Sequence, residues 1–200
     1  MKKSKKLILL SGKKRTGKDT VADYLVKQYN FESRAFANKL RGYAYQFLHY
    51  FLDYEGAPQV VYNDTLKDIP ITNKCGLEIQ FKNEALTPRK LLQYLGTDVF
   101  RDNFDSDFWV NKVITSLQNH DFVNNFVITD CRFPNEIDKV KDELENFYNI
   151  TSIRIHRNTG LHDTHLSETA LDDYTDFDYV IENNGTLEEL YQKVDRILWT

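Results

Sequence analysis

Short apolar runs alternate with longer amphipathic segments along the chain. We expect buried strands at five such runs, residues 7–11, 33–37, 126–129, 150–156 and 179–181. Segments with apolar positions at helical spacing lie between them. Strands separated by helices predict an α/β fold with a mostly parallel central sheet and helices on both faces, which makes three layers.

Local signals mark the ends of several expected helices. Residues 87–88, Thr-Pro, are typical of an N-cap followed by the first helical position, and Gly96 is a natural stop for the same helix. Pro134 opens a later helix. Thr186 and Glu189 have the spacing of a capping box, which predicts where the last helix begins.

The length of 200 residues suits one well-buried domain better than two independent ones. Residues 53–86 contain Pro58, Pro70 and Gly76 among scattered apolar positions. This composition predicts an irregular insertion or substrate lid with a short hairpin. We therefore expect a single domain over residues 1–200 that carries the insertion at 53–86.

The segment GKKRTGKDT at residues 12–20 follows the first expected strand and opens a helix. Four residues separate Gly12 from Gly17, and Lys18 comes next, which is the spacing of a phosphate-binding P-loop. Such a loop turns backbone N–H groups toward phosphate oxygens, and the helix adds its positive N-terminal end. A chance glycine turn is the alternative, but the strand before it and the helix after it favour a nucleoside triphosphate site.

The other residues of this loop leave their roles open. Lys13 and Arg15 can contact phosphate or remain solvated, and Thr16 adds a hydroxyl. Asp19 occupies the place where a metal-binding Ser or Thr usually follows the lysine, and Thr20 comes one position later. Asp19 is therefore a candidate for Mg²⁺ binding, for orienting a phosphate or for favourable charge at a helix N-terminus, whereas Thr20 could supply the expected metal ligand.

A second acidic group follows the run at residues 126–129. Asp130 is expected beside the P-loop at the carboxyl end of a parallel strand, where a P-loop kinase needs a further carboxylate for Mg²⁺. Arg132 and Glu136 come close behind it and can share the same rim. Their alternatives are a surface ion pair for Arg132 and helix N-terminal charge for Glu136.

Residues 87–110 combine cations with amide and aromatic groups, which suits an acceptor that carries a phosphate and a base. The candidates are Arg89, Lys90, Gln93, Gly96, Thr97 and Trp109. Each has a plainer interpretation, since a helical Trp is more often core and cations in a first helical turn are more often solvated.

Composition excludes little else. The formal net charge of -4 gives no general attraction to nucleic acid or anionic membranes, and no apolar run has membrane-spanning length. We therefore expect no nucleic-acid or membrane partner. Two cysteines make no disulfide framework, which favours the reducing environment of the cytoplasm. The aromatic stretch at residues 43–51 is compatible with core, a pocket wall or a homodimer face.

Several segments, taken together and in their order along the chain, resemble the deoxynucleoside monophosphate kinases of large tailed bacteriophages, within the nucleoside monophosphate kinase-like P-loop group. The resemblance covers most of the chain apart from residues 53–86. The segments are GKKRTGKDT (12–20), FANKLR (36–41), TPRKLLQYLGTDVFRD (87–102), DFWV (107–110), ITDCRFPNEID (128–138), HLSE (165–168) and NNGTLEEL (183–190).

The resemblance implies a three-layer P-loop NTPase fold and transfer of the γ-phosphate of ATP to a deoxynucleoside 5′-monophosphate, giving a diphosphate and ADP in the host cytoplasm. It implies that Mg²⁺ accompanies ATP. It also implies three groups of residues. The ATP phosphates and metal would be held by Gly17, Lys18, Asp19 and Thr20, with Asp19 catalytic, and the acceptor by Arg89, Lys90, Gly96, Thr97 and Trp109. The centre would be completed by Asp130, Arg132 and Glu136: Arg132 as a charge stabiliser, the two carboxylates as orienters or water-mediated metal ligands, and Arg132 and Glu136 also as contacts of the acceptor.

Two interpretations compete for residues 154–165, which are rich in Arg and His: a lid that closes over ATP, with Arg157 as its mobile cation, or an ordinary solvated loop. Two other functions compete with the kinase above. One is a P-loop kinase for another phosphorylated metabolite, such as a phosphomevalonate-like acceptor, and the other is a nucleotide-binding switch. The sequence has no NKxD-type guanine-recognition motif.

Overall fold

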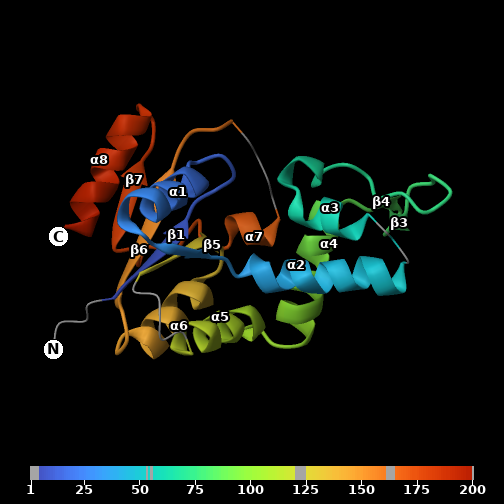
Figure 1. Cartoon of the computed structure of the whole chain (residues 1–200), viewed down its shortest axis with the longest axis horizontal. Helices are drawn as coiled ribbons and strands as arrows, with labels where there is room; N and C mark the ends of the chain where they lie inside the picture. Colours follow the sequence, from blue (N-terminus) through green and yellow to red (C-terminus); the bar gives the residue numbers. More distant parts are fainter. Residues whose placement is uncertain (1–4, 53, 55, 120–124, 161–164, 200) are drawn as a thin grey trace. The chain divides into compact units, whose positions relative to one another are not determined.

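The computed structural model describes residues 5–52, 54, 56–119, 125–160 and 165–199. The chain divides into two compact units, coloured along the sequence in Figure 1. Unit 1 comprises Met1–Phe36 with Val110–Thr200, and unit 2 comprises Ala37–Trp109. The expected single domain with an insertion at residues 53–86 stays a prediction.

A parallel five-stranded sheet forms the centre of unit 1. Its strands are β1 (Lys6–Ser11), β2 (Glu32–Arg34), β5 (Phe126–Cys131), β6 (Asn149–His156) and β7 (Tyr179–Glu182). They run in the order β2-β5-β1-β6-β7, and every neighbouring pair is parallel. The central strand β1 is covered on both faces, which explains its continuous apolar run. The mostly parallel sheet is confirmed, although β2 ends earlier than the expected strand at 33–37.

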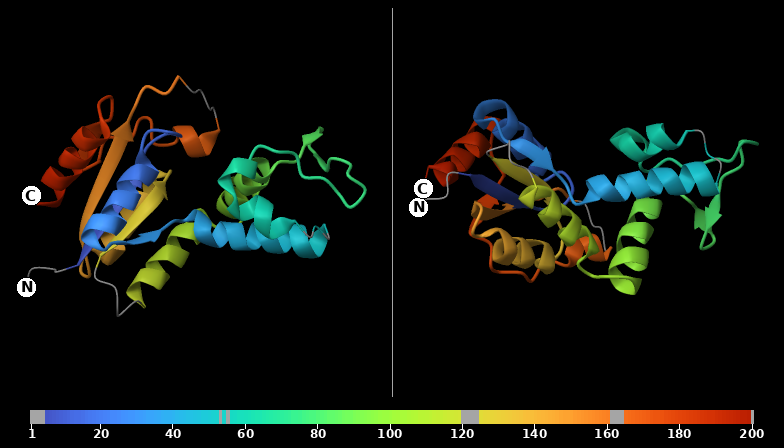
Figure 2. Two further views of the ribbon diagram at one scale, coloured as in Figure 1. Left: turned by 45° about the horizontal axis from the view of Figure 1, so that its top comes forward. Right: turned by 60° about the horizontal axis from the view of Figure 1, so that its bottom comes forward.

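Helices cover both faces of this sheet, as expected. They are α1 (Lys18–Tyr29), α5 (Phe108–Gln118), α6 (Pro134–Leu144), α7 (Leu166–Thr169) and α8 (Leu187–Leu198). In Figures 1 and 2, α1 and α8 lie on one face, and α6 lies on the other with the part of α5 that belongs to unit 1. Buried side chains of α1 and α8 pack on β1, β5, β6 and β7 in one core cluster. No helix within the described ranges is long and apolar enough to cross a membrane.

The ends of these helices follow the local signals in part. The capping box is confirmed, because the Thr186 hydroxyl accepts from the Glu189 N–H and the Glu189 carboxylate accepts from the Thr186 N–H, both at 3.3 Å. Pro134 opens α6 as expected. Phe147 and Leu187 continue the apolar spacing of the helices that begin at Pro134 and after Thr186, which predicts buried positions, but they are 52% and 47% exposed. Phe147 lies beyond the end of α6, so helical spacing does not apply to it, and Leu187 is only the first residue of its helix.

Unit 2 is mainly helical and has its own core. Its elements are α2 (Ala37–Gln46), the π-helix η1 (Phe47–Phe51), α3 (Ala57–Tyr62), the 3₁₀ turn η2 (Asp64–Leu66), the antiparallel pair β3 (Gln80–Phe81) and β4 (Glu84–Ala85), α4 (Pro88–Gln93) and the π-helix η3 (Tyr94–Arg101). Its buried cluster joins apolar residues of α2, η1, α3, α4 and η3. The short hairpin expected within residues 53–86 is confirmed, but α3 was not expected.

The helix that begins after Thr87 does not stop at Gly96. The Thr87 side chain accepts a hydrogen bond from the Lys90 N–H at 3.2 Å, which confirms the start. The chain then continues through Gly96 as η3. A Cβ on Gly96 would lie 2.8 Å from Leu40 Cδ2, so this glycine makes room for a packed side chain instead of ending the helix.

Candidate active site

The expected P-loop lies between β1 and α1, at the carboxyl end of the central strand. Its first and last glycines both have positive φ, 152° at Gly12 and 106° at Gly17. A Cβ on Gly12 would lie 2.5 Å from the Ile155 carbonyl oxygen, so space as well as conformation requires glycine. The 12-residue helix α1 begins at Lys18 and adds its positive N-terminal end to the loop. The strand-loop-helix context is therefore confirmed.

Hydrogen bonds inside the loop converge on one carbonyl. The Lys13 carbonyl oxygen accepts from Lys18 Nζ at 3.0 Å and from the Thr16 hydroxyl at 2.9 Å. Burial lowers the pKa of Lys18, and the nearby positive charge of Arg132 lowers it further, whereas Asp19, Glu168 and Asp130 act in the opposite direction. A cation whose pKa is depressed in this way gains from a bound anion, as a phosphate site requires.

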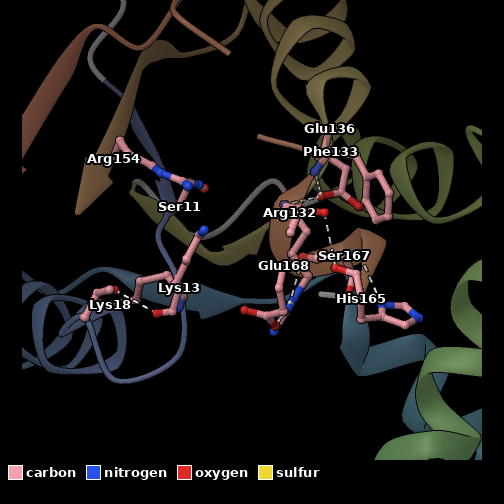
Figure 3. A network of polar contacts seen from close by, with 12 residues as sticks. Ser11, Lys13, Lys18, Arg132, Phe133, Glu136, Arg154, His165, Ser167 and Glu168 are labelled. Carbon is pink, nitrogen blue, oxygen red and sulfur yellow. Dashed lines mark hydrogen bonds and ion pairs between the residues drawn. The ribbon is translucent and has the colours of Figure 1, made fainter. Parts of the chain in front are cut away.

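Arg132 is held by an acidic side chain from a distant part of unit 1, as Figure 3 shows. Its guanidinium forms an ion pair with Glu168 and donates to the Ser167 carbonyl at 3.2 Å. The Glu168 side chain is only 8% exposed. Burial would lower the pKa of Arg132, but the charge and hydrogen bond of Glu168 outweigh it and raise the pKa. Arg132 is therefore a firmly charged group near Lys18.

The segment that carries Glu168 is itself braced. His165 Nδ1 accepts from the Ser167 N–H at 3.1 Å and lies 2.8 Å from the Ser167 hydroxyl. These contacts cap the short helix α7, from which Glu168 reaches Arg132 (Figure 3).

The two carboxylates near Arg132 anchor the backbone. Asp130 is inside β5 and not beyond its end, and its Oδ1 accepts from the Phe36 N–H at 2.8 Å. Glu136 is 3% exposed, and its Oε2 accepts from the N–H groups of Arg132 at 2.6 Å and Phe133 at 3.1 Å. The alternative interpretation of Glu136, charge at a helix N-terminus, accounts for these bonds. Its catalytic and acceptor-binding roles stay predictions.

A second polar network lies beside the P-loop and was not anticipated. Lys13 Nζ is 2.7 Å from Asp172 Oδ2, and Asp172 Oδ1 is 3.2 Å from an Arg154 guanidinium nitrogen. Arg154 also donates to the Ser11 hydroxyl at 2.8 Å. It is 5% exposed and belongs to β6, so residues 154–156 form part of the strand that was expected at 150–156 and are not part of a lid.

A cavity of about 210 Å³ opens beside these groups. Its lining includes Lys13 and Thr16 of the P-loop together with Arg154, Arg157 and Asn158. Arg157 directly follows β6, which brings this cation to the same cavity as the loop. Cations and amides around one cavity suit a phosphorylated ligand. The rest of the lid hypothesis includes residues 161–164, which lie outside the described residues.

The remaining donor-side candidates surround the start of α1. Arg15 is exposed, with φ of 64°, while Asp19 is exposed and Thr20 half-buried in the first turn. Among the described residues, no group of three His, Cys, Asp or Glu side chains could hold a metal alone. Mg²⁺ bound mainly by substrate phosphates needs only one or two protein oxygens, and the oxygen donors of Asp19, Thr20 and Asp130 fit that chemistry.

The cations proposed for the acceptor lie in unit 2, each with an acidic neighbour. Arg89 Nε is 2.5 Å from Asp68 Oδ1, and its terminal nitrogen is 3.1 Å from the other carboxylate oxygen. Lys90 forms an ion pair with Glu84. Gln93 is half-buried at the end of α4.

The other acceptor candidates, Gly96, Thr97 and Trp109, are buried in unit 2. The Trp109 indole is 3% exposed, and its N–H donates to the Gly96 carbonyl at 3.0 Å. Its ring contacts those of Tyr43 and Phe100. This placement favours the core interpretation of Trp109, which shapes unit 2 from inside. A direct contact between the indole and a base stays a prediction.

Sequence reasoning missed four polar residues that support the site: Asp172, Arg154, Glu168 and Asn183. Asn183 donates from its side chain to the Thr16 carbonyl at 2.8 Å. Glu168 and Asn183 lie within two of the resembling segments, HLSE and NNGTLEEL, which was the available signal for them. Asp172 had no such signal, and Arg154 was noted only as part of the Arg- and His-rich segment 154–165.

Comparison with known proteins adds independent findings. The family model described as deoxynucleotide monophosphate kinase matches residues 6–65 and 52–194. A protein of Acanthamoeba polyphaga mimivirus, provisionally named a deoxynucleotide monophosphate kinase, is 32% identical over 205 residues, which cover 94% of this chain and 93% of that protein. The deoxynucleotide monophosphate kinase of Enterobacteria phage T4 is 27% identical over 245 residues, covering 96% and 98%. Among solved structures, a gluconokinase from Sinorhizobium meliloti 1021 is similar with a TM-score of 0.46 and 10% identity, over 99% of this chain and 98% of that chain.

Proposed function

Because the chain belongs to the deoxynucleotide monophosphate kinase family, we propose that it transfers the γ-phosphate of ATP to a deoxynucleoside 5′-monophosphate. The products are a deoxynucleoside diphosphate and ADP. The observation that carries the proposal is the phosphate loop from Gly12 to Lys18 between β1 and the start of α1, in a chain that the family model matches almost throughout.

In the proposed reaction, a phosphate oxygen of the acceptor forms a bond to the γ-phosphorus of ATP. The bond from that phosphorus to the bridging oxygen of ADP breaks, and ADP leaves with the electron pair. Such transfers depend on alignment and on neutralising the phosphate oxygens, with little covalent chemistry from the protein. Lys18 and the loop N–H groups would hold the β- and γ-phosphates. Arg132, fixed by Glu168, would balance charge on the transferred group.

The other ATP contacts are proposed for Lys13, Thr16 and Arg157, which line the same cavity. Mg²⁺ that arrives with ATP would supply further positive charge at the phosphates and would be held through Asp19, Thr20 or Asp130. For the acceptor we propose four contacts in unit 2: Arg89, Lys90, Gln93 and Thr97. Their support is the pairing of cations with an amide and a hydroxyl.

The direct test is a substrate panel. ATP is incubated with each of the four common deoxynucleoside monophosphates, with their ribose counterparts and with no acceptor, and ADP formation is measured. We expect ADP to depend on the acceptor and on Lys18, so that Lys18→Met abolishes turnover. Lys27→Met, an exposed lysine in the last turn of the same helix, serves as the matched control and should retain turnover. ADP formation at one unchanged rate with every acceptor, or with none, would exclude this function.

The comparisons favour neither a phosphomevalonate-like acceptor nor a nucleotide-binding switch. By analogy with the phage and mimivirus relatives, we place the reaction in the cytoplasm of an infected cell. Whether the chain works as a homodimer is a separate prediction, which sedimentation of the purified protein would test.

A further inference from the structure

Asn183 connects the last strand of the sheet to the phosphate loop. It directly follows β7, and the residue is 7% exposed. Its own N–H donates to the His156 carbonyl at the end of β6, at 2.7 Å. Its amide nitrogen donates to the Thr16 carbonyl at 2.8 Å. Because a carbonyl oxygen can only accept, the amide group must face Thr16 with its nitrogen.

This hydrogen bond acts on the peptide that joins Thr16 to Gly17. No cis peptide bond occurs among the described residues, so this peptide is trans, and its C=O and N–H point in opposite directions. Holding the Thr16 oxygen toward Asn183 therefore turns the Gly17 N–H to the other side of the peptide plane. A phosphate cradle depends on such N–H groups being fixed toward the anion before it binds.

The adjoining glycine fits this arrangement closely. Gly17 has φ of 106°, and a Cβ on it would lie 2.6 Å from the Asn183 amide nitrogen. Gly17 thus leaves the space that Asn183 occupies, while Asn183 holds the peptide before it. The two residues form one packed unit, although 166 positions separate them in the sequence.

We infer that Asn183 is a positioning residue for the phosphate loop: it sets the direction of the Gly17 N–H and thereby the affinity of the loop for the phosphates of ATP. It acts through Thr16 and Gly17 and has no contact of its own with the substrate. The inference rests on the proposed function only in that ATP is the donor. It assigns a role to the segment that begins at residue 183, which the phosphate-loop motif itself does not include.

The test compares variants of two neighbouring asparagines. Asn183→Ala removes the donor, and Asn183→Ser keeps a shorter hydroxyl donor. Asn184→Ala is the matched control, because Asn184 has the same side chain next in sequence but is exposed. Calorimetry measures binding of ATP, of inorganic tripolyphosphate and of a deoxynucleoside monophosphate, while thermal unfolding shows whether each variant is folded.

We expect Asn183→Ala to weaken both ATP and tripolyphosphate by about tenfold or more, since it leaves the Thr16 carbonyl unpartnered and the peptide free to turn. Asn183→Ser should recover part of this loss. Monophosphate binding should change by less than about twofold, and Asn184→Ala should leave all three ligands unaffected, as surface substitutions usually do.

Three outcomes would overturn the inference. Normal tripolyphosphate binding by folded Asn183→Ala would show that the bond does not set the loop. Loss of ATP binding alone would place Asn183 at the base or ribose instead. Equally weakened binding of all three ligands would indicate general damage to the fold. If Asn183→Ala does not fold, Asn183→Ser provides the test, and it must weaken binding of tripolyphosphate more than binding of the monophosphate. Failure of the proposed function is separate, since it would appear as wild-type protein that binds ATP but phosphorylates no monophosphate.

Discussion

Replacing Glu168 by glutamine tests how much of the catalytic rate depends on holding Arg132 in place. The substitution removes the negative charge that faces the guanidinium but keeps the shape of the side chain. Glu168 is 8% exposed and Arg132 39%, so the pair lies between a buried and a surface ion pair. Breaking a buried pair costs about 3–5 kcal/mol, and exposed pairs are worth about 0–1 kcal/mol. For this geometry we take about 2 kcal/mol, which corresponds to a fall of about 30-fold in kcat.

A double-mutant cycle measures whether the effect passes through Arg132. Initial rates of ADP formation give kcat and both KM values for wild type, Glu168→Gln, Arg132→Ala and the double variant. If Glu168 acts only by orienting Arg132, Glu168→Gln should change nothing further once Arg132 is alanine. Glu143→Gln is the control, because Glu143 pairs with Lys139 at 3.7 Å on the surface of α6 and should change kcat by less than about twofold.

The reasoning fails if the two substitutions multiply in their effects on kcat. Glu168 would then act on the reaction independently of Arg132. It also fails if Glu168→Gln alone leaves kcat unchanged, since the ion pair would then contribute nothing to the orientation of the guanidinium.

Three further predictions concern stability. Burial and Arg132 depress the pKa of Lys18, so its charge destabilises the fold at pH values below that pKa, and this cost disappears as pH rises above the ordinary lysine range. Lys18→Met should therefore raise Tm at pH 7 and raise it less at higher pH. A gain in Tm no larger than that of Lys27→Met would contradict this. Trp109→Phe should cost about 1–3 kcal/mol, because it removes the indole N–H that donates to the Gly96 carbonyl and reduces the volume of a buried ring, with KM for the monophosphate little changed; a raised KM at unchanged Tm would restore the base-stacking role. Thr186→Ala removes the cap of α8 and should cost about 1 kcal/mol, or about 2–4 °C in Tm, with kcat at 25 °C unaffected; an unchanged Tm would show that the cap contributes nothing.

Features that depend on a few consecutive residues could be predicted from the sequence. The strand before the P-loop is apolar from Leu7 to Leu10 because β1 is central and covered on both faces. Thr186 and Glu189 satisfy each other three positions apart, so their spacing alone located the start of α8. The loop from Gly12 to Lys18 could be predicted for the same reason, because phosphate binding requires glycines and a lysine at fixed intervals.

Features that depend on packing between distant segments could not be predicted. A glycine after a run of helical spacing is typical of a helix end, which is why Gly96 was expected to stop the helix. The Leu40 side chain instead occupies the space that this glycine leaves, and the helix continues. Arg154 belongs both to the strand expected at 150–156 and to the Arg- and His-rich segment 154–165 that suggested a lid; the structure places it in β6, where Ser11 of β1 and the more distant Asp172 accept its hydrogen bonds. A linear pattern does not reveal either partner, because each lies in another element of its unit.

Charge balance explains why the most important omissions were carboxylates. The P-loop motif supplies Lys18, and Arg132 stands close enough to lower its pKa. Together with Lys13, these cations would repel one another in a loop that has not yet bound phosphate. Asp172 faces Lys13, and Glu168 faces Arg132 and also favours the charge of Lys18, so two carboxylates from the C-terminal part of unit 1 offset these three cations. The motif therefore explains the attraction for ATP, whereas the folded chain around it explains how three cations can be held in place before ATP arrives.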